Sequence, residues 1–139
     1  MVNTIGDSLN SGYSLSTTNV TYWFSSTHNG WSAYEKQQFQ AAFQLWGNVS
    51  NLQFSQATSQ AQANFLLLNV TGAEMQAETG ASGVLGFFYL PTSPNQQQGW
   101  FNRDGIGWDQ ANANGGLEQG GYGFITMVHE LGHALGLSH

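Results

Sequence analysis

The sequence closes with His129-Glu130-Leu131-Gly132-His133-Ala134-Leu135-Gly136-Leu137-Ser138-His139, eleven residues that hold three of its four histidines. His129 and His133 are four residues apart, so on a helix they project from one face, about one turn or ~6 Å from each other. Two neutral imidazoles in this arrangement can bind one metal ion, and zinc is the ion that such nitrogen donors favour. The spacing therefore predicts a helix that binds zinc.

The remaining residues of this segment complete the predicted site. Glu130 lies ~100° around the helix axis from His129, where a carboxylate can act as a general base beside the metal without being a ligand. His139 would point ~240° away from His133 if the helix continued. Gly136 can turn the chain, because glycine adopts the left-handed conformation at a helix end at little cost. Three histidines leave one coordination position open, as in catalytic zinc sites.

Two amphipathic helices are predicted from apolar residues that recur every three or four positions. The first begins at a capping box formed by Ser32 and Glu35. The second contains the histidine segment. Their apolar faces consist of Phe39, Ala42, Phe43, Trp46 and Val49 in the first, and Phe124, Val128, Leu131 and Leu135 in the second.

Short runs of β-branched and aromatic residues predict the strands. They are residues 20–25, 63–70, 84–90, which Pro91 ends, and 100–102. No repeat or linker divides the chain. The order of strand, helix, strands, long loops and helix predicts a single α+β domain, a two-layer α/β sandwich.

Composition excludes several classes of function. The chain has 139 residues, only 2 of them Lys or Arg against 8 Asp or Glu, so it has no basic patch for nucleic acid. It has no apolar run of ~20 residues that could span a membrane. The absence of cysteine excludes disulfides, thiol catalysis and cysteine-bound metal. Residues 1–7 have neither the cationic start nor the apolar stretch of a signal peptide.

The pattern His-Glu-x-x-His-x-x-Gly-x-x-His resembles the zinc signature of the metzincin metallopeptidases. Other segments are similar to the serralysin and matrixin branch of that family. They are residues 9–13, 21–24, 39–46, 52–54, 86–91, 99–102 and 121–123.

The resemblance implies a zincin-like upper subdomain, in which one backing helix and one active-site helix cover a twisted mixed sheet. It implies a secreted, extracellular zinc metalloendopeptidase with His129, His133 and His139 as metal ligands and Glu130 as the base. A peptide or protein substrate would lie extended along the edge strand, at Val84, Leu85, Gly86, Phe87, Phe88 and Tyr89.

One departure from the family limits these expectations. In the family, a segment containing a methionine turn follows the third histidine, whereas this sequence closes at His139 and Met127 precedes the motif. We therefore expect residues 1–139 to be one catalytic domain that lacks the C-terminal subdomain. The uncovered cleft would favour self-association, and an inactive fragment of the peptidase is an alternative.

Two further alternatives stay open on the sequence alone. The first is a non-catalytic zinc-binding or glycan- or peptide-binding module, in which Trp23, Trp31, Trp100 and Trp108 stack on sugars rather than pack in the core. The second concerns calcium as an additional cofactor. Oxygen donors for that cation occur at Asn102, Asp104 and Asp109, which otherwise are turn residues.

Overall fold

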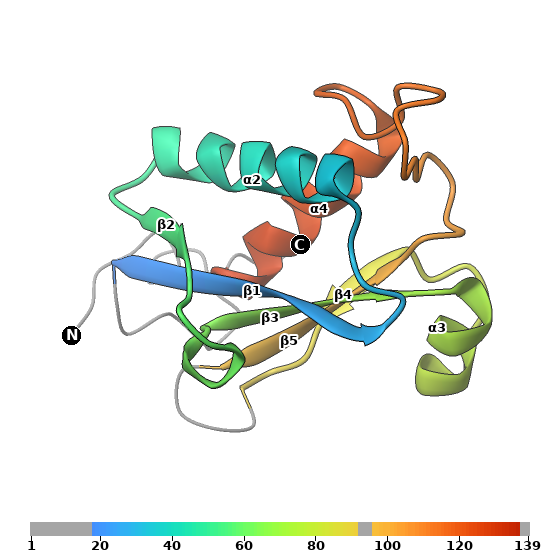
Figure 1. Cartoon of the computed structure of the whole chain (residues 1–139), viewed down its shortest axis with the longest axis horizontal. Helices are drawn as coiled ribbons and strands as arrows, with labels where there is room; N and C mark the ends of the chain where they lie inside the picture. The colour runs from blue at the N-terminus through green and yellow to red at the C-terminus, as the bar shows by residue number, and fades with distance from the viewer. Residues whose placement is uncertain (1–17, 92–95, 137–139) are drawn as a thin grey trace.

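The computed structural model describes residues 18–91 and 96–136. Its centre is a five-stranded mixed sheet with the strand order β2-β1-β3-β5-β4 (Figure 1). Four strands run parallel, and β4 lies antiparallel to β5 at one edge. The strands are β1 (Asn19–His28), β2 (Gln53–Gln56), β3 (Phe65–Val70), β4 (Gly86–Phe88) and β5 (Gln97–Asn102).

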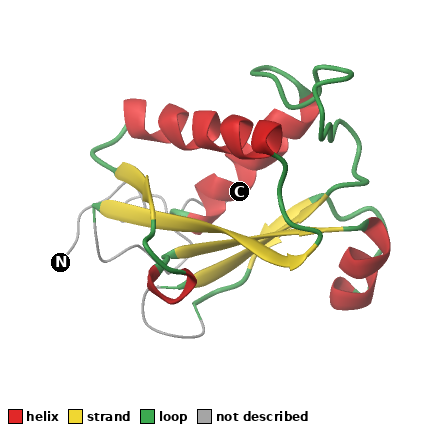
Figure 2. Ribbon diagram, viewed as in Figure 1, coloured by secondary structure: helices red, strands yellow, loops and turns green. Residues whose placement is uncertain are grey.

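Two long helices cover one face of this sheet, and a short helix lies near its end (Figure 2). The long helices are α2 (Ala33–Asn48) and α4 (Tyr122–Ala134), which pack against each other. The short elements are α3 (Gly72–Thr79), which follows β3, and the 3-10 turn η1 (Gln60–Gln62). This arrangement confirms the predicted α+β class and the pair of helices on a mixed sheet.

An aromatic core fills the space between the sheet and the two long helices. Phe39 of α2 meets Phe101 of β5 edge-on, with ring centroids 4.9 Å apart, and Phe43 stacks on Tyr22 at 4.4 Å. Leu131 of α4 is fully buried in the same cluster. Aromatic contacts of this kind add to the free energy gained from apolar burial, and they hold both helices in register on the sheet.

The opposite face of the sheet carries a smaller apolar cluster. Alternate residues of β3, Leu66 and Leu68, lie there beside Trp100 of β5. Met75 of α3 covers them and is 1 % exposed. Because both faces are covered, all six residues of β3 are buried, which is typical of a central parallel strand.

The close approach of two backbone segments positions the start of α4. The loop after β5 returns to the helix at Gly116, whose carbonyl accepts a hydrogen bond from the Gly123 N–H at 3.0 Å. A Cβ on Gly116 would lie 2.0 Å from the carbonyl oxygen of Gly107. Glycine is therefore required here for the loop to pack against the first turn of α4.

Several predicted details change in the structure. The capping box of α2 is confirmed, but Val49 is 71 % exposed because it caps the helix with φ −112° and ψ 9°, off the helical face. Strand β4 is shorter than the predicted strand 84–90, and strand β5 is longer than the predicted strand 100–102. Periodicity missed α3, although Thr71 and Glu74 form a second capping box at its start.

No helix within the described parts of the chain, residues 18–91 and 96–136, is long and apolar enough to cross a membrane.

Candidate functional site

The two histidines of α4 direct the same ring nitrogen to one point. The Nε2 atoms of His129 and His133 are 3.0 Å apart, and the two rings are nearly perpendicular, at 87°. Two nitrogen ligands of a tetrahedral zinc ion, each ~2.05 Å from the metal, are about 3.3 Å apart. The donor type and the separation therefore fit one zinc ion bound by both side chains.

The apolar pattern of α4 determines where these side chains lie. Phe124, Met127 and Leu131 are buried against the sheet and α2. The helix consequently turns His129 outward, where it is exposed, and leaves His133 half-buried. The pattern of one helix thus separates a packing face from the face that carries the two histidines.

A hydrogen bond from α2 supports α4 next to the first histidine. The indole Nε1–H of Trp46 donates to the carbonyl oxygen of Val128 at 3.0 Å. Sequence periodicity assigned Trp46 only to the apolar face of its helix, because a bond between residues 82 positions apart leaves no local signal.

Glu130 lies between α4 and the edge strand β4. A Cβ on Gly86 would be 3.2 Å from Cγ of Glu130, so the absence of a side chain at residue 86 leaves room for the glutamate. Burial raises the pKa of Glu130 to about 7, and the nearby His133 opposes this rise. A general base is most effective when its pKa is near the working pH.

The helix ends as the sequence predicts. Gly136 has φ +100°, and its N–H donates to the carbonyl oxygen of His133 at 2.9 Å. This left-handed turn leads the chain away from the helix axis. The predicted third ligand, His139, lies outside the described residues. Within residues 18–91 and 96–136 no group of three side chains that could hold a metal ion occurs, so the described site contains two candidate ligands and Glu130.

The predicted substrate segment, residues 84–89, forms the edge of the sheet near Glu130. The Leu85 carbonyl accepts from the Asn102 N–H at 3.0 Å, and the Tyr89 N–H donates to the Gln98 carbonyl at 2.9 Å. Antiparallel pairing alternates along a strand, so Gly86 and Phe88 turn their N–H and C=O groups away from β5, whereas Phe87 faces it.

The intervening residues of β4 have different side-chain positions. Gly86 and Phe88 face the layer of α4, where Phe88 packs on the main core, whereas Phe87 packs on the opposite cluster. The outward backbone groups of Gly86 and Phe88 are therefore placed to pair with another extended chain.

The three candidate calcium ligands instead stabilise turns. Asn102 Oδ1 accepts from the Asp104 N–H, and Asp104 Oδ2 accepts from the Gly72 N–H. Backbone N–H groups, that of Asn114 foremost, bind the Asp109 carboxylate and lower its pKa. These contacts agree with the turn interpretation.

Of the tryptophans proposed for sugar stacking, Trp100 is buried and the other three are half-buried. The Trp31 indole donates to the Leu67 carbonyl at 3.1 Å, and the Trp108 indole donates to Glu35 at 2.7 Å. Trp100 is 8 % exposed, and Trp23 is partly buried against the second cluster. All four tryptophans pack against one of the two apolar clusters, as the core interpretation predicts.

Comparison with known proteins identifies the family to which the chain is similar. The family model of the peptidase M10 matrixins matches residues 14–139. The serralysin of Photorhabdus laumondii is 30 % identical over 84 % of this chain and 22 % of that protein. Serralysin B of Dickeya chrysanthemi is 31 % identical over 99 % and 27 %. The macrophage metalloelastase of Oryctolagus cuniculus is 34 % identical over 72 % and 20 %. The chain spans about a quarter of these curated relatives or less.

Proposed function

The chain belongs to the matrixin family of zinc metallopeptidases, and from this premise we propose that it carries the zinc-binding and catalytic helix of an endopeptidase. The observation that carries the proposal is the convergence of His129 and His133 at 3.0 Å with Glu130 beside the edge strand. His139 is the proposed third ligand. Its support is the position of the left-handed turn at Gly136, three residues earlier.

The chemistry divides between the metal and the chain's own residues. Zinc, when bound, supplies the positive charge that polarises a peptide carbonyl and lowers the pKa of water. A carboxylate oxygen of Glu130 accepts a proton from the attacking water and then delivers it to the leaving amine. Its partial burial, together with a pKa of about 7, suits both steps.

The edge strand supplies the proposed substrate site. An extended peptide would pair with the outward N–H and C=O groups of Gly86 and Phe88, within the segment Val84 to Tyr89. Backbone pairing of this kind binds a main chain with little dependence on its side chains. We further propose that the domain acts on peptides or proteins outside the cell.

We also propose that the domain self-associates through the uncovered cleft. A concentration series in gel filtration would test this self-association.

Zinc stoichiometry is the decisive test of the metal site. The gel-filtered chain, after one equivalent of zinc at neutral pH, is expected to retain one zinc per chain. His129→Ala and His133→Ala should each lose the metal. His28→Ala is the matched control, because this fourth histidine lies at the end of β1 and bonds Glu74 instead. Equal zinc retention in all three variants would overturn the ligand assignment.

Peptide cleavage then tests the base. Glu130→Gln should keep zinc and lose hydrolysis by about 10²- to 10⁴-fold, the usual contribution of a general base. The control is Glu118→Gln, an exposed glutamate whose carboxylate accepts a hydrogen bond from Tyr34 of α2, outside the proposed catalytic and substrate sites. Full activity in Glu130→Gln would remove Glu130 from this role.

A further inference from the structure

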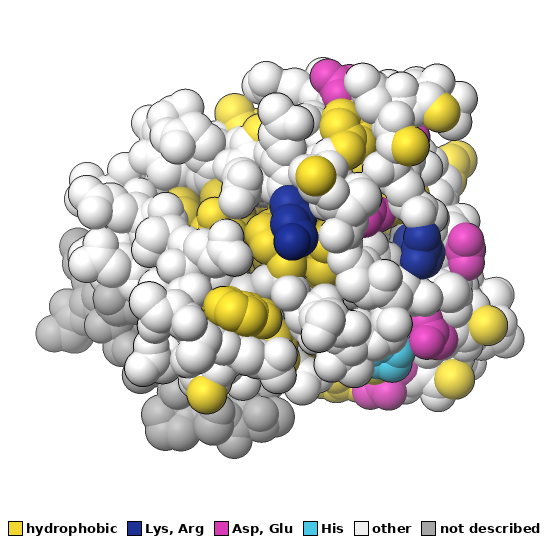
Figure 3. Space-filling model, viewed as in Figure 1, with side chains coloured by type: hydrophobic (Ala, Val, Ile, Leu, Met, Phe, Trp, Pro, Cys, Tyr) yellow, Lys and Arg dark blue, Asp and Glu magenta, His cyan; other side chains and the backbone are white. Residues whose placement is uncertain are grey.

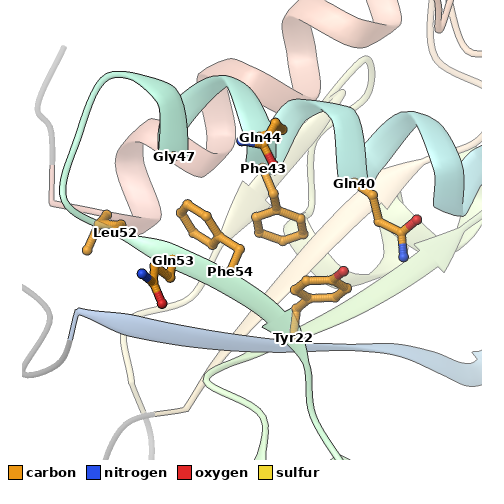
Figure 4. A pocket seen from close by; sticks show the side chains of 8 residues that line it. All are labelled: Tyr22, Gln40, Phe43, Gln44, Gly47, Leu52, Gln53 and Phe54. Atoms are coloured by element: carbon orange, nitrogen blue, oxygen red, sulfur yellow. The ribbon is translucent and has the colours of Figure 1, made fainter.

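A pocket separate from the metal helix opens between α2 and the strands β1 and β2. Its volume is about 380 Å³, within the range of small-molecule sites. Figure 4 shows that its side chains come from these three elements, apart from Leu52 in the turn before β2. None of the residues that line it belongs to α4, so the pocket is distinct from the proposed catalytic site.

The wall of the pocket combines apolar rings with neutral amides. Phe43 and Phe54, whose ring centroids are 5.0 Å apart, form the apolar part. Gln40, Gln44 and Gln53 form the polar part, and each of them is exposed. No residue that lines the pocket carries a charge. In Figure 3, the described left part of the molecular face shows only uncharged side chains.

This combination selects a chemical class of ligand. A glutamine amide both donates and accepts hydrogen bonds, as a hydroxyl group does. The Nε2 group of Gln44 donates to Asn48 Oδ1 at 2.8 Å, so the bond to Asn48 does not use the Gln44 carbonyl oxygen. A charged ligand would lose hydration without finding an opposite charge. A neutral ligand with many hydroxyl groups and apolar C–H faces matches both parts of the wall.

Gly47 gives independent support, because its missing side chain keeps the pocket open. It lies inside α2, and its φ is outside the left-handed region that favours glycine. A Cβ there would make only ordinary contacts, 3.5 Å from the Leu52 carbonyl oxygen and 3.7 Å from Phe54. Glycine inside a helix costs about 1 kcal/mol relative to alanine. Neither the backbone nor packing explains this cost, whereas an open pocket does.

We propose that this pocket binds a neutral saccharide of one or two sugar rings. The amides of Gln40, Gln44 and Gln53 bond its hydroxyl groups, and its C–H faces pack on the exposed part of Phe54. The site would hold a glycan between α2 and the β2 edge of the sheet, beside the main core and independently of metal binding.

Amide chemical shifts test this binding directly. The zinc-free chain is titrated with maltose, cellobiose and N,N′-diacetylchitobiose. At least one of these sugars should produce saturable shifts confined to the amides of residues 40–54 and of Tyr22. Gln40→Ala should weaken binding about fivefold through loss of one hydrogen bond. Gln37→Ala, a change to an exposed glutamine of the same helix outside the pocket, should leave affinity unchanged.

A second variant fills the pocket. Gly47→Leu should abolish the shifts, while Gly47→Ala should fold at least as stably as the wild type. If Gly47→Leu does not fold, Gln53→Ala replaces it with the same fivefold loss. Three results would overturn the proposal. They are no saturable shift with any of the three sugars, equal affinity in Gln40→Ala and Gln37→Ala, and shifts of these amides by an apolar tripeptide but by no sugar.

Discussion

Two glutamates face the same sheet from two different helices, and their surroundings are opposite. Glu35, in the first turn of α2, is 2 % exposed and accepts three hydrogen bonds, from Ser32 N–H, Asn69 Nδ2 and Trp108 Nε1. Glu130, in α4, lies against Gly86 and makes no side-chain hydrogen bond with any residue in the described parts of the chain. Both carboxylate oxygens of Glu35 accept hydrogen bonds that stabilise the fold, whereas those of Glu130 accept none from the described residues.

This difference indicates that Glu35 has a structural role, whereas Glu130 is suited to proton transfer. Glu35 joins the start of α2 to β3 and to the loop after β5, so its bonds hold three segments together. Glu130 is desolvated without compensating donors, which raises its pKa to about 7. Such an uncompensated group costs stability and is typical of a site where protons move.

The largest expected effect removes the structural carboxylate. Glu35→Ala leaves three donors without their acceptor in a buried place, so the free energy of unfolding should fall by about 3 kcal/mol. Urea unfolding of the zinc-free protein measures this change. Glu78→Ala, an exposed glutamate on α3, is the control and should change stability by less than about 0.5 kcal/mol. A loss in the free energy of unfolding below about 1 kcal/mol for Glu35→Ala would show that the three hydrogen bonds of Glu35 are not a major support of the fold.

A smaller effect comes from the same isosteric change at both positions. Glu35→Gln replaces one accepting carboxylate oxygen by an NH₂ group, which then faces an N–H donor of the surrounding fold. The free energy of unfolding should fall by about 1–2 kcal/mol. Glu130→Gln disturbs no hydrogen bond of the described structure and should stay within about 0.5 kcal/mol of the wild type. Thermal or urea unfolding in the presence of a chelator compares the two. Equal losses would show that Glu130 also supports the fold.

The smallest effect concerns a third glutamate with the same capping role as Glu35 but greater exposure. The Thr71 backbone N–H and the His28 ring lower the pKa of Glu74 to about 2, from an ordinary value of 4.5. A lowered pKa in the folded state means that Glu74 stabilises the fold above about pH 4.5 and loses this contribution as the pH falls to about 2.

Glu74→Gln should therefore reduce stability at pH 6 and approach the wild type near pH 2.5. Because the pair is at the surface, the difference should be a fraction of 1 kcal/mol. Urea midpoints of both proteins across this range measure it. A difference that grows toward acid pH would contradict the assigned direction.

Local sequence signals predicted the parts of the molecule that depend on neighbouring residues. Three such predictions are confirmed. They are the placement of His129 and His133 on one face of a helix, the capping box at Ser32 and the turn at Gly136. Each depends on contacts within one or two helical turns, for which helix geometry suffices.

Other elements escaped prediction because their signals are short or polar. Helix α3 has eight residues and buries only Met75, so its capping box was the one available sign. Strand β2 is polar, so periodicity did not reveal it and only the family resemblance of residues 52–54 pointed to it; its position follows from parallel pairing with β1, Val20 beside Phe54. Strand periodicity cannot reveal a pairing between residues so far apart in the chain.

The amino-acid sequence by itself determined the donor atoms of this protein and the helix that presents two of them, because side-chain chemistry and helical spacing are local properties. Tertiary structure alone decided that Glu35 would be saturated with hydrogen bonds and that Glu130 would lie uncompensated beside an edge strand. Those outcomes depend on which distant segments pack against each glutamate: residues 69 and 108 for the first, and residue 86 for the second. Burial and long-range partners, rather than residue type, set the role of a carboxylate.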